Sequence, residues 1–400
     1  MKIMYVLVLF TSATALAEDI PSEVTADQAV ALYREHSLRL VTDRAAVGVA
    51  AADVIGARLY PNPTLGVAPT STVHGTDTIG GTQAVISLDV PLLLGHQRRR
   101  RERAAEAGVA AARAEVAASQ NVAEHEVRGL VVALQATQQK VATLRAAVDD
   151  VQIVRAIVLG RARAGAASPY ELERMDLAVA TMTSELAEAN TEVALASRAL
   201  GKAVGLPGGE PRAAGELAFS TRGDPTVAAG HPFLMAARSE RAAAEAQEDR
   251  ARADGLPVPS LGLQSFATMT PSGIAVGAGF SIPLPLFDRN QGAIARAKAE
   301  AVRAGLEVAA RERDLRIDLD TARSELGARR ATLVNFEQGA LARLDHLREM
   351  AETAYRSGQG GIVELLDAVE AITSARLRHL DLLRGVVDAE LAVRAASTGD

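Results

Sequence analysis

The side chains best suited to catalysis or metal binding are scattered along this 400-residue sequence. It has no cysteine, and its seven histidines form no HxH, HxxxH or HExxH pair. The histidines are His36, His74, His96, His125, His231, His346 and His379. A nucleophile motif, a phosphate-binding loop and a pair of catalytic acids are also missing. The sequence therefore predicts no enzyme, no resident metal and no cofactor, and it excludes a disulfide scaffold and a cysteine-ligated metal site.

The densest charge is a run of four arginines directly after a predicted strand. They are Arg98, Arg99, Arg100 and Arg101. The run also begins a predicted helix, where cations oppose the helix dipole, so a compensating anion is expected. Phospholipid head groups are our hypothesis for that anion, and the alternative is a solvated helix face.

Two glycine-containing turns, at 163–169 and 357–361, are predicted to connect pairs of helices. Glycine stops a helix, and Ser168 followed by Pro169 is a favourable start of the next one. The candidate turn residues are Gly165, Ala166 and Ser168 in the first turn and Gly358, Gln359 and Gly360 in the second. The acids that follow are Glu171, Glu364 and Asp367. Their simplest role is to complement the dipole in the first turn of a helix.

Composition is typical of long packed helices. Hydrophobic residues make up 48% of the chain but aromatic residues only 3%, and tryptophan is absent. The apolar fraction is too high for a disordered protein. A net charge of −6 argues against nucleic acid as the main partner.

Residues 1–17 are predicted to be a secretory signal peptide. Lys2 precedes an apolar run at 3–10, and small residues at 15–17 mark a cleavage site. This apolar run is too short for a membrane helix, and no other stretch approaches 18 apolar residues. The chain is therefore expected to be exported, and any part that enters a membrane is expected to be β structure.

The chain contains an internal repeat. PNPTLG at 61–66 matches PVPSLG at 257–262, and VPL at 90–92 matches IPL at 282–284. Gly165 followed by Tyr170-Glu171-Leu172 matches Gly358 followed by Val363-Glu364-Leu365. Because the three matches are collinear, they predict a tandem duplication. The expected parts are a first repeat at 18–209, a linker at 210–230 and a second repeat at 231–396.

Each repeat is predicted to contain one very long helix, at 97–163 and at 290–356. Apolar residues follow heptad spacing, as at Val127, Leu134, Val141 and Val148. Roughly 65 residues at about 1.5 Å per residue make a helix about 100 Å long. The shorter helices are expected at 25–58 (with Thr25 as the N-cap), 169–204, 231–254 and 362–395.

Two β-hairpins are predicted, at 64–90 and 260–282. Apolar residues alternate along the strands, as at Ala84, Ile86, Leu88 and Val90. Each strand has about nine residues, which is enough to cross a bilayer when tilted. Four strands cannot close a barrel and would leave open edges in lipid, so the chain is expected to oligomerise, giving eight strands with two copies or twelve with three.

The alternative for the strands is a pair of ordinary hairpins that cover a soluble core. Two observations weigh against it. Ala275, Gly277 and Gly279 on the second face are too small to build a core. No other β segment is predicted that could pack against the hairpins.

An exported, duplicated chain with two hairpins, two very long helices and proline-marked strand–helix junctions resembles the TolC family of outer-membrane factors. Its length and its lack of a lipid-anchor cysteine resemble the CzcC-like metal-efflux branch. The resemblance covers essentially the whole mature chain. It implies a mainly α fold in which a homotrimer forms a 12-stranded outer-membrane β-barrel continuous with a periplasmic α-helical barrel.

The resemblance also implies a function. Such a trimer is the outer-membrane exit duct of a tripartite pump, with a periplasmic adaptor (membrane fusion protein) and an inner-membrane RND-type transporter as partners. Its cargo would be metal ions or small toxic compounds. The alternative is a soluble periplasmic coiled-coil adaptor or scaffold, but the sequence lacks the lipoyl-like β domain of an adaptor.

Residues 355–367 resemble the family segment Y-x-x-G-x-x-x-I-x-[DE]-x-L-D at the narrow periplasmic end of the tunnel. The resemblance implies that Glu364 and Asp367 line this gate, where six carboxylates in a trimer attract cations and repel anions. It also implies that Tyr355 holds the gate shut with Glu171 as acidic partner. Some family members carry an arginine where this chain has Gly360, so no charged clamp is expected there.

The resemblance assigns one further contact, because the two helical turns would be the tips at which the adaptor docks. Our own hypothesis for the arginine run is contact with phospholipid head groups at the inner edge of the outer membrane.

Overall fold

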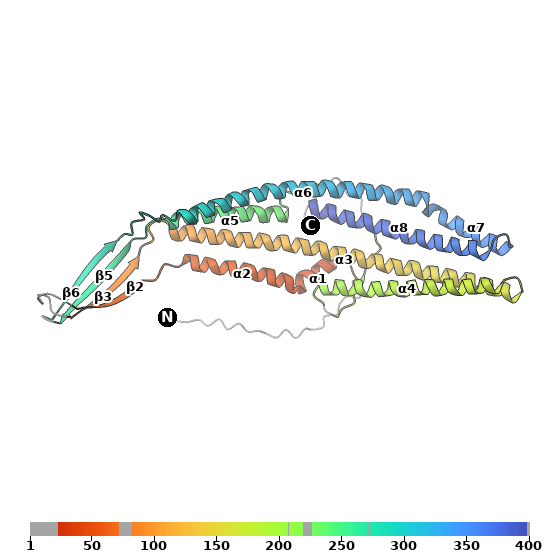
Figure 1. The fold of residues 1–400 in the computed structure, drawn as a ribbon, viewed down its shortest axis with the longest axis horizontal. Coiled ribbons are helices and arrows are strands. Elements are labelled where there is room, and N and C mark those ends of the chain that lie inside the picture. The colour runs from red at the N-terminus through yellow and green to blue at the C-terminus, as the bar shows by residue number, and fades with distance from the viewer. Residues whose placement is uncertain (1–22, 72–81, 207, 219–225, 270–271, 398–400) are drawn as a thin grey trace. The chain divides into compact units, whose positions relative to one another are not determined.

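The computed structural model describes residues 23–71, 82–206, 208–218, 226–269 and 272–397. The predicted signal peptide, His74 and the connection within the first hairpin lie outside these residues. The chain divides into two compact units, and both repeats contribute to each. We call them the sheet unit (39–122, 226–319 and 396–400) and the tip unit (1–38, 123–225 and 320–395). The fold is mainly helical with a small β part, as predicted (Figure 1).

Within the described residues, the sheet unit consists mainly of four helices or parts of helices and four strands. Its helices are α2 (Leu38–Arg58), the first part of α3 (Gln97–Arg163), α5 (Pro232–Asp254) and the first part of α6 (Gln291–Gly339). Its strands are β2 (Thr64–Ser71), β3 (Thr82–Pro91), β5 (Ser260–Met269) and β6 (Ser272–Ser281). No described helix carries an apolar stretch long enough to cross a membrane.

The two predicted hairpins form one antiparallel sheet, because β3 also pairs with β5. The strand order is β2-β3-β5-β6, so β2 and β6 are its edges within the described residues. One row across the sheet is Val67, Ile86, Ser265 and Val276, and the next row on the same face is Leu65, Leu88, Leu263 and Ala278. The register therefore collects most of the large apolar residues of the four strands on one face, whereas Val85 and Phe266 lie on the other.

Ion pairs join the helices of the sheet unit. Arg58 of α2 donates to Glu102 of α3 at 2.7 Å and to Glu106 at 3.1 Å. On α5, Arg238 donates to Glu312 of α6 at 2.9 Å, beside an apolar cluster of α5 and α6. These contacts place a short helix beside the long helix of its own repeat.

The tip unit is helical apart from two short strands. Its helices are α1 (Ala26–His36), the rest of α3, α4 (Pro169–Ala203), the rest of α6, η1 (Leu341–Arg343), α7 (Leu344–Ser357) and α8 (Ile362–Ser397). Its strands are β1 (Glu23–Val24) and β4 (Arg212–Ala213). A buried cluster joins α3, α4, α7 and α8 and includes Val151, Val158, Met175, Tyr355 and Leu365. In Figure 1, α4 lies beside the end of α3 and α8 lies beside α7.

The single helix predicted at 25–58 is two helices. Thr25 is the N-cap of α1, and its hydroxyl accepts from the Gln28 amide at 3.3 Å in a capping box. The helix stops at Ser37, whose backbone is extended with ψ 116°. Serine competes with the helix for backbone hydrogen bonds, which favours a break at this residue.

The second long helix, predicted at 290–356, is also interrupted. It ends at Gly339, passes through η1 and resumes as α7, whereas α3 of the first repeat is continuous over 67 residues. Glycine is a poor helix former, and the amide of Arg343 donates to Ala340 in the tighter pattern of a 3₁₀ turn. Heptad spacing alone did not reveal this break.

Residues 210–218 of the predicted linker at 210–230 are packed within the tip unit. Their strand β4 pairs with β1, although no β segment was expected outside the hairpins. The Ala213 amide donates to Gln138 of α3 at 3.1 Å, and the Gln135 side chain donates to the Ala214 carbonyl at 2.8 Å. Leu217 is buried between α3 and α8. Backbone hydrogen bonds and a buried leucine therefore hold a segment that was predicted to be a linker between the repeats.

Candidate functional site

The two predicted tips have the same backbone geometry. Gly165 and Gly358 are left-handed, with φ of 75° and 74°. After them, the Ala166 amide donates to the Arg161 carbonyl at 2.8 Å, and the Gln359 amide donates to the Ala354 carbonyl at 2.9 Å. This is the glycine-stopped helix end expected for both turns, and its recurrence agrees with the duplication.

Two of the three acids after the tips cap helices. The Glu171 carboxylate accepts from the Ser168 amide at 2.7 Å, in a capping box at the start of α4. Glu364 accepts from the Gly361 amide at 2.9 Å at the start of α8. Asp367 lies one turn further along α8 and is exposed, as is Glu364. Glu171 and Glu364 therefore have the simple role expected of first-turn carboxylates, whereas Asp367 lies beyond the first turn. Glu364 and Asp367 also present charge to solvent.

Tyr355 is buried, with 1% of its surface exposed. Its hydroxyl forms no hydrogen bond with the described residues, so the expected bond to Glu171 is not present within one chain. Burial, and then the nearby Glu171 carboxylate, raise the pKa of Tyr355 above its usual value, while Arg161 acts in the opposite direction. The phenol is therefore neutral and serves as part of the apolar cluster.

Arg161 connects the two tips, a contact that the sequence does not predict. Its guanidinium donates to the Tyr355 carbonyl at 2.8 Å and to the Ala166 carbonyl at 3.2 Å. The same group lies 4.5 Å from the centre of the Tyr355 ring, a cation–π distance. The only local signal was a cation in the last turn of α3, where the helix dipole also favours one.

Gly360, the position where some family members carry an arginine, packs closely on α7. A Cβ atom at this residue would lie 3.2 Å from the Cβ of Ala354. A side chain at this position would displace its neighbour. The charged clamp between the tips therefore comes from Arg161 of α3 and not from the second tip.

A second arginine holds α7 against α3. Arg348 donates to both carboxylate oxygens of Asp150, at 3.0 Å and 2.8 Å, and to Glu352 at 3.0 Å. A bidentate pair fixes orientation as well as distance. Together with Arg161, it attaches α7 to α3 at two levels.

The arginine run lies in the sheet unit, where the strands give way to helices. Arg100 pairs with Asp249, and Arg101 donates to Asp254 at 3.0 Å. For Arg100 and Arg101, the anions expected beside this run are therefore carboxylates of α5. Arg98 lies 5.0 Å from the centre of the Tyr60 ring, and Arg99 is exposed.

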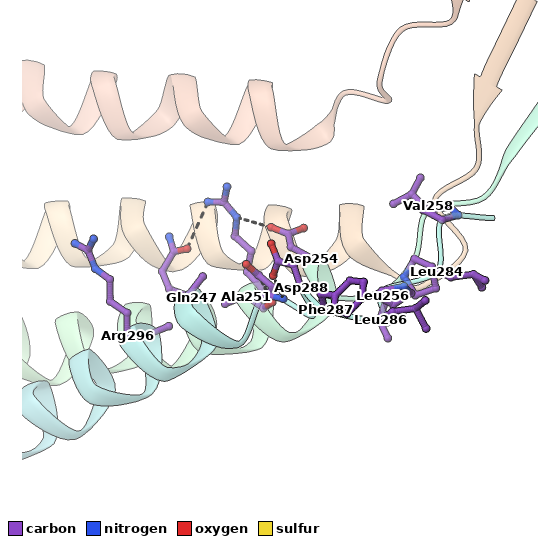
Figure 2. A pocket seen from close by; sticks show the side chains of 18 of the residues that line it. Gln247, Ala251, Asp254, Leu256, Val258, Leu284, Leu286, Phe287, Asp288 and Arg296 are labelled. Carbon is purple, nitrogen blue, oxygen red and sulfur yellow. Dashed lines mark hydrogen bonds and ion pairs between the residues drawn. The ribbon is translucent and has the colours of Figure 1, made fainter. Parts of the chain in front are cut away.

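A pocket of about 970 Å³ lies at the strand–helix junction of the second repeat. Figure 2 shows Leu284 and Leu286 at one end of it and Gln247 and Arg296 at the other. Phe287, also in its lining, is 90% exposed. The pocket therefore places an apolar surface beside charged groups. No cluster of histidine, aspartate and glutamate that could hold a metal occurs in the described residues.

Comparison with known proteins identifies the family. The model of the family described as outer membrane efflux protein matches the chain twice, at 27–206 and 226–399. The chain belongs to the outer membrane efflux protein family. The two matched segments correspond to the two repeats.

Individual relatives of this efflux protein agree with that assignment. It is 26% identical over 336 residues to the cobalt-zinc-cadmium resistance protein CzcC of Cupriavidus metallidurans, covering 82% of this chain and 79% of CzcC. It is 29% identical over 285 residues to the protein CyaE of Bordetella pertussis, covering 64% of this chain and 58% of CyaE. The fold is similar to the crystal structure of the outer membrane protein VceC of Vibrio cholerae, with a TM-score of 0.72, 18% identity and coverage of 94% and 97%.

These findings confirm the predicted resemblance, the outer-membrane location and the role of an efflux duct. They do not support the alternative of a soluble periplasmic adaptor or scaffold. The matched proteins are efflux and outer-membrane proteins, in agreement with the prediction that the chain is not an enzyme.

Proposed function

We propose that three copies of this efflux protein close their sheets into a 12-stranded barrel that continues into a periplasmic helical barrel. The trimer would be the exit duct of a tripartite system, docked to a periplasmic adaptor and an RND-type inner-membrane transporter. The observation that carries the proposal is the apolar face of the sheet, which no described residue covers.

The apolar face runs across all four strands. Val67 of β2 is 66% exposed, Leu263 of β5 48% and Val276 of β6 79%. Soluble proteins rarely leave so continuous an apolar surface in water, whereas hydrocarbon favours it. The other face carries Ser87, Gln264 and several glycines besides Val85 and Phe266, and its polar and small residues suit a water-filled lumen.

The two edges of the sheet favour a barrel that is closed by more than one copy of the chain. β2 and β6 each have a neighbour on one side only within the described chain. An unpaired backbone group in lipid costs several kcal/mol, so edge must meet edge in a closed ring. Eight strands leave an interior filled by side chains, while twelve leave a wider lumen. Because a duct needs an open lumen, three copies are favoured over two.

The proposed cargo includes divalent transition-metal cations. The support is the similarity to CzcC, whose name describes resistance to cobalt, zinc and cadmium. Glu364 and Asp367 supply exposed carboxylates at one tip, and in a trimer they would form an acidic ring that attracts cations.

The location and assembly can be tested together by membrane fractionation. The full chain should appear in the outer membrane as a heat-modifiable oligomer, and its deletion should raise cellular zinc, cobalt or cadmium in the host. A soluble periplasmic monomer would contradict the proposed duct. An outer-membrane oligomer without any metal phenotype would contradict the proposed cargo alone.

The acidic ring has its own test. Glu364→Gln with Asp367→Asn removes the charge but keeps an oxygen to cap α8. We expect weaker block by multivalent cations in planar bilayers and lower cation selectivity, because carboxylates concentrate cations at a narrow entrance. Glu245→Gln on α5 is the control for loss of a carboxylate elsewhere in the chain. If the double variant and the control behave alike, the acidic ring is not part of the gate.

The two tips are proposed to dock the adaptor. Gly165, Ala166, Ser168, Gly358 and Gln359 are exposed, whereas Gly360 is half-buried. The tight helix ends present backbone and small side chains, which allow the helices of a partner to approach closely.

The proposed contact with lipid head groups narrows to Arg98 and Arg99, since the other two arginines pair with α5. Arg98→Gln with Arg99→Gln should reduce insertion into vesicles that contain anionic phospholipid and leave insertion into neutral vesicles unchanged. Arg100→Gln with Arg101→Gln should instead weaken the contact with α5 and so reduce insertion into both kinds of vesicle. Equal insertion of native and Arg98/Arg99 variant chains into anionic vesicles would rule out the lipid contact.

A further inference from the structure

The pocket at the strand–helix junction of the second repeat has an apolar end and a charged end. Leu256, Leu284 and Leu286 line the apolar end and are 48%, 72% and 66% exposed. They belong to the connections that lead into β5 and out of β6, whereas Gln247 and Arg296 at the other end belong to α5 and α6 (Figure 2). The apolar end is therefore the end nearer the sheet.

Charged residues of both signs line the pocket. They are Arg250, Asp254, Asp288, Arg296 and Glu300. Arg250 pairs with Asp254 at 3.5 Å, and Arg296 pairs with Glu300 at 2.9 Å. The carboxylate of Asp288 accepts from the backbone amide two residues later at 2.8 Å and has no ion pair with the described residues. Asp288 therefore supplies a negative charge that no described cation compensates.

The next residue, Arg289, supplies a positive charge at the rim of the pocket. Its Nε donates to the carbonyl of Pro285 at 3.1 Å, and Pro285 lines the pocket between two of the exposed leucines. Arg289 is exposed and, like Asp288, forms no ion pair with the described residues. The two terminal nitrogens of its guanidinium are therefore available to a bound anion.

The same stretch of the first repeat lacks both of these charges. Residues 90–97 read VPLLLGHQ and residues 284–291 read LPLFDRNQ, so Leu94 and Gly95 stand where the second repeat has Asp288 and Arg289. The two stretches make the same turn, because the residue before each glutamine is left-handed, with φ of 61° and 62°. The turn itself therefore does not require the two charges.

We propose that this pocket binds one glycerophospholipid with a zwitterionic, amine-bearing head group, for which phosphatidylethanolamine is the probe. The proposal rests on the proposed placement of the sheet in the bilayer and adds a lipid site at its boundary. The acyl chains lie on the exposed leucines. The Arg289 guanidinium binds the phosphate through its planar fork, and the Asp288 carboxylate accepts from the ammonium.

The charge of the pocket selects the class of lipid. The lining and Arg289 together carry three arginines and three carboxylates. An anionic head group finds no net attraction there, because its phosphate meets as many carboxylates as guanidiniums. A zwitterionic head group pairs with both signs, and an apolar ligand would leave the two unpaired charges without a partner.

The order of groups along the pocket agrees with the order along the lipid. In a glycerophospholipid the phosphate follows the acyl-bearing glycerol, and the amine comes last. The Arg289 guanidinium is held at the Pro285 carbonyl, beside the leucines. Figure 2 shows Asp288 between the leucines and Arg296. A volume of about 970 Å³ accommodates the head group and the first part of the chains.

Native mass spectrometry of the oligomer tests the site. The full chain is purified from outer membranes, washed with detergent and titrated with one lipid at a time. We expect one phosphatidylethanolamine per chain. Phosphatidylcholine, whose quaternary ammonium has no N–H donor, and phosphatidylglycerol, which has no amine, should bind about tenfold more weakly, as expected for one lost charge-assisted hydrogen bond.

A matched pair of variants separates the site from general surface charge. Asp288→Asn with Arg289→Gln removes one charge of each sign, and the asparagine oxygen still accepts the backbone amide of the turn. Binding of phosphatidylethanolamine should fall at least about tenfold. The control is Arg303→Gln with Glu307→Gln, an ion pair at 3.7 Å further along α6 that does not line the pocket. The control should bind like the native chain.

A single variant gives a readout that a purely structural role would not move. Asp288→Lys replaces the acceptor for the ammonium by a cation, so the preferred lipid should change from phosphatidylethanolamine to phosphatidylglycerol. If this variant and the native chain rank the three lipids alike, the proposed role of Asp288 is wrong.

The outcomes separate the lipid site from the proposed duct. An oligomer that binds the three lipids equally carries adventitious lipid only, and an oligomer that binds none has this pocket covered by another copy of the chain. Either result overturns the lipid site and leaves the duct intact. Failure to obtain any oligomer from the outer membrane would overturn the duct itself.

Discussion

Replacing Val276 by arginine is expected to prevent the chain from assembling in the outer membrane. Val276 lies on edge strand β6 within the uncovered apolar face and is 79% exposed. In a barrel this side chain faces lipid, where an arginine costs about 2–4 kcal/mol near the midplane. A trimer would contain three such residues. The measurement is the amount of heat-modifiable oligomer in the outer-membrane fraction.

The adjacent residue on the opposite face is the matched control. Gly277 shares a row with Gly66, Ser87 and Gln264, and a Cβ atom at this position meets its nearest atom, in Phe266, at an uncrowded 3.9 Å. Gly277→Arg should therefore assemble normally and alter only the conductance of the lumen. If Gly277→Arg fails to assemble while Val276→Arg succeeds, the lipid-facing and lumen-facing sides are reversed.

Replacing Arg161 by alanine is expected to hold the channel open. The variant removes the donor to the Tyr355 and Ala166 carbonyls and the cation from the Tyr355 ring. A hydrogen bond from a charged group contributes about 2 kcal/mol, so the closed–open equilibrium should shift by roughly 30-fold. Single-channel recording in planar bilayers should show higher conductance or longer openings.

Two further variants define what Arg161 does. Arg161→Lys keeps the charge but lacks the planar fork that reaches two carbonyls, so an intermediate shift is expected. Arg155→Ala is the control, since Arg155 lies on the same helix and pairs with Asp176 of α4 at 2.5 Å, not with α7. Native gating in Arg161→Ala would show that the clamp does not keep the duct closed.

Much of the fold follows from the order of residues along the chain. Heptad spacing such as Val127, Leu134 and Val141 predicts the long helices, because burial of one side of a helix repeats every seven residues. Alternation at Ile86 and Leu88 predicts strands with one apolar face in the same way. Capping is also local, which is why Ser168 could be assigned before the structure was known.

Only the tertiary structure decided how these elements meet. The pairing of β3 with β5, the partners of Arg100 and Arg101 on α5, and the clamp formed by Arg161 join residues far apart in the sequence. The breaks at Ser37 and Gly339 also appeared only there. Periodicity states which side of an element is buried, but the partner of a given guanidinium depends on how two helices are rotated and shifted against each other. That relation is set by packing along their whole contact, and no short stretch of sequence contains it.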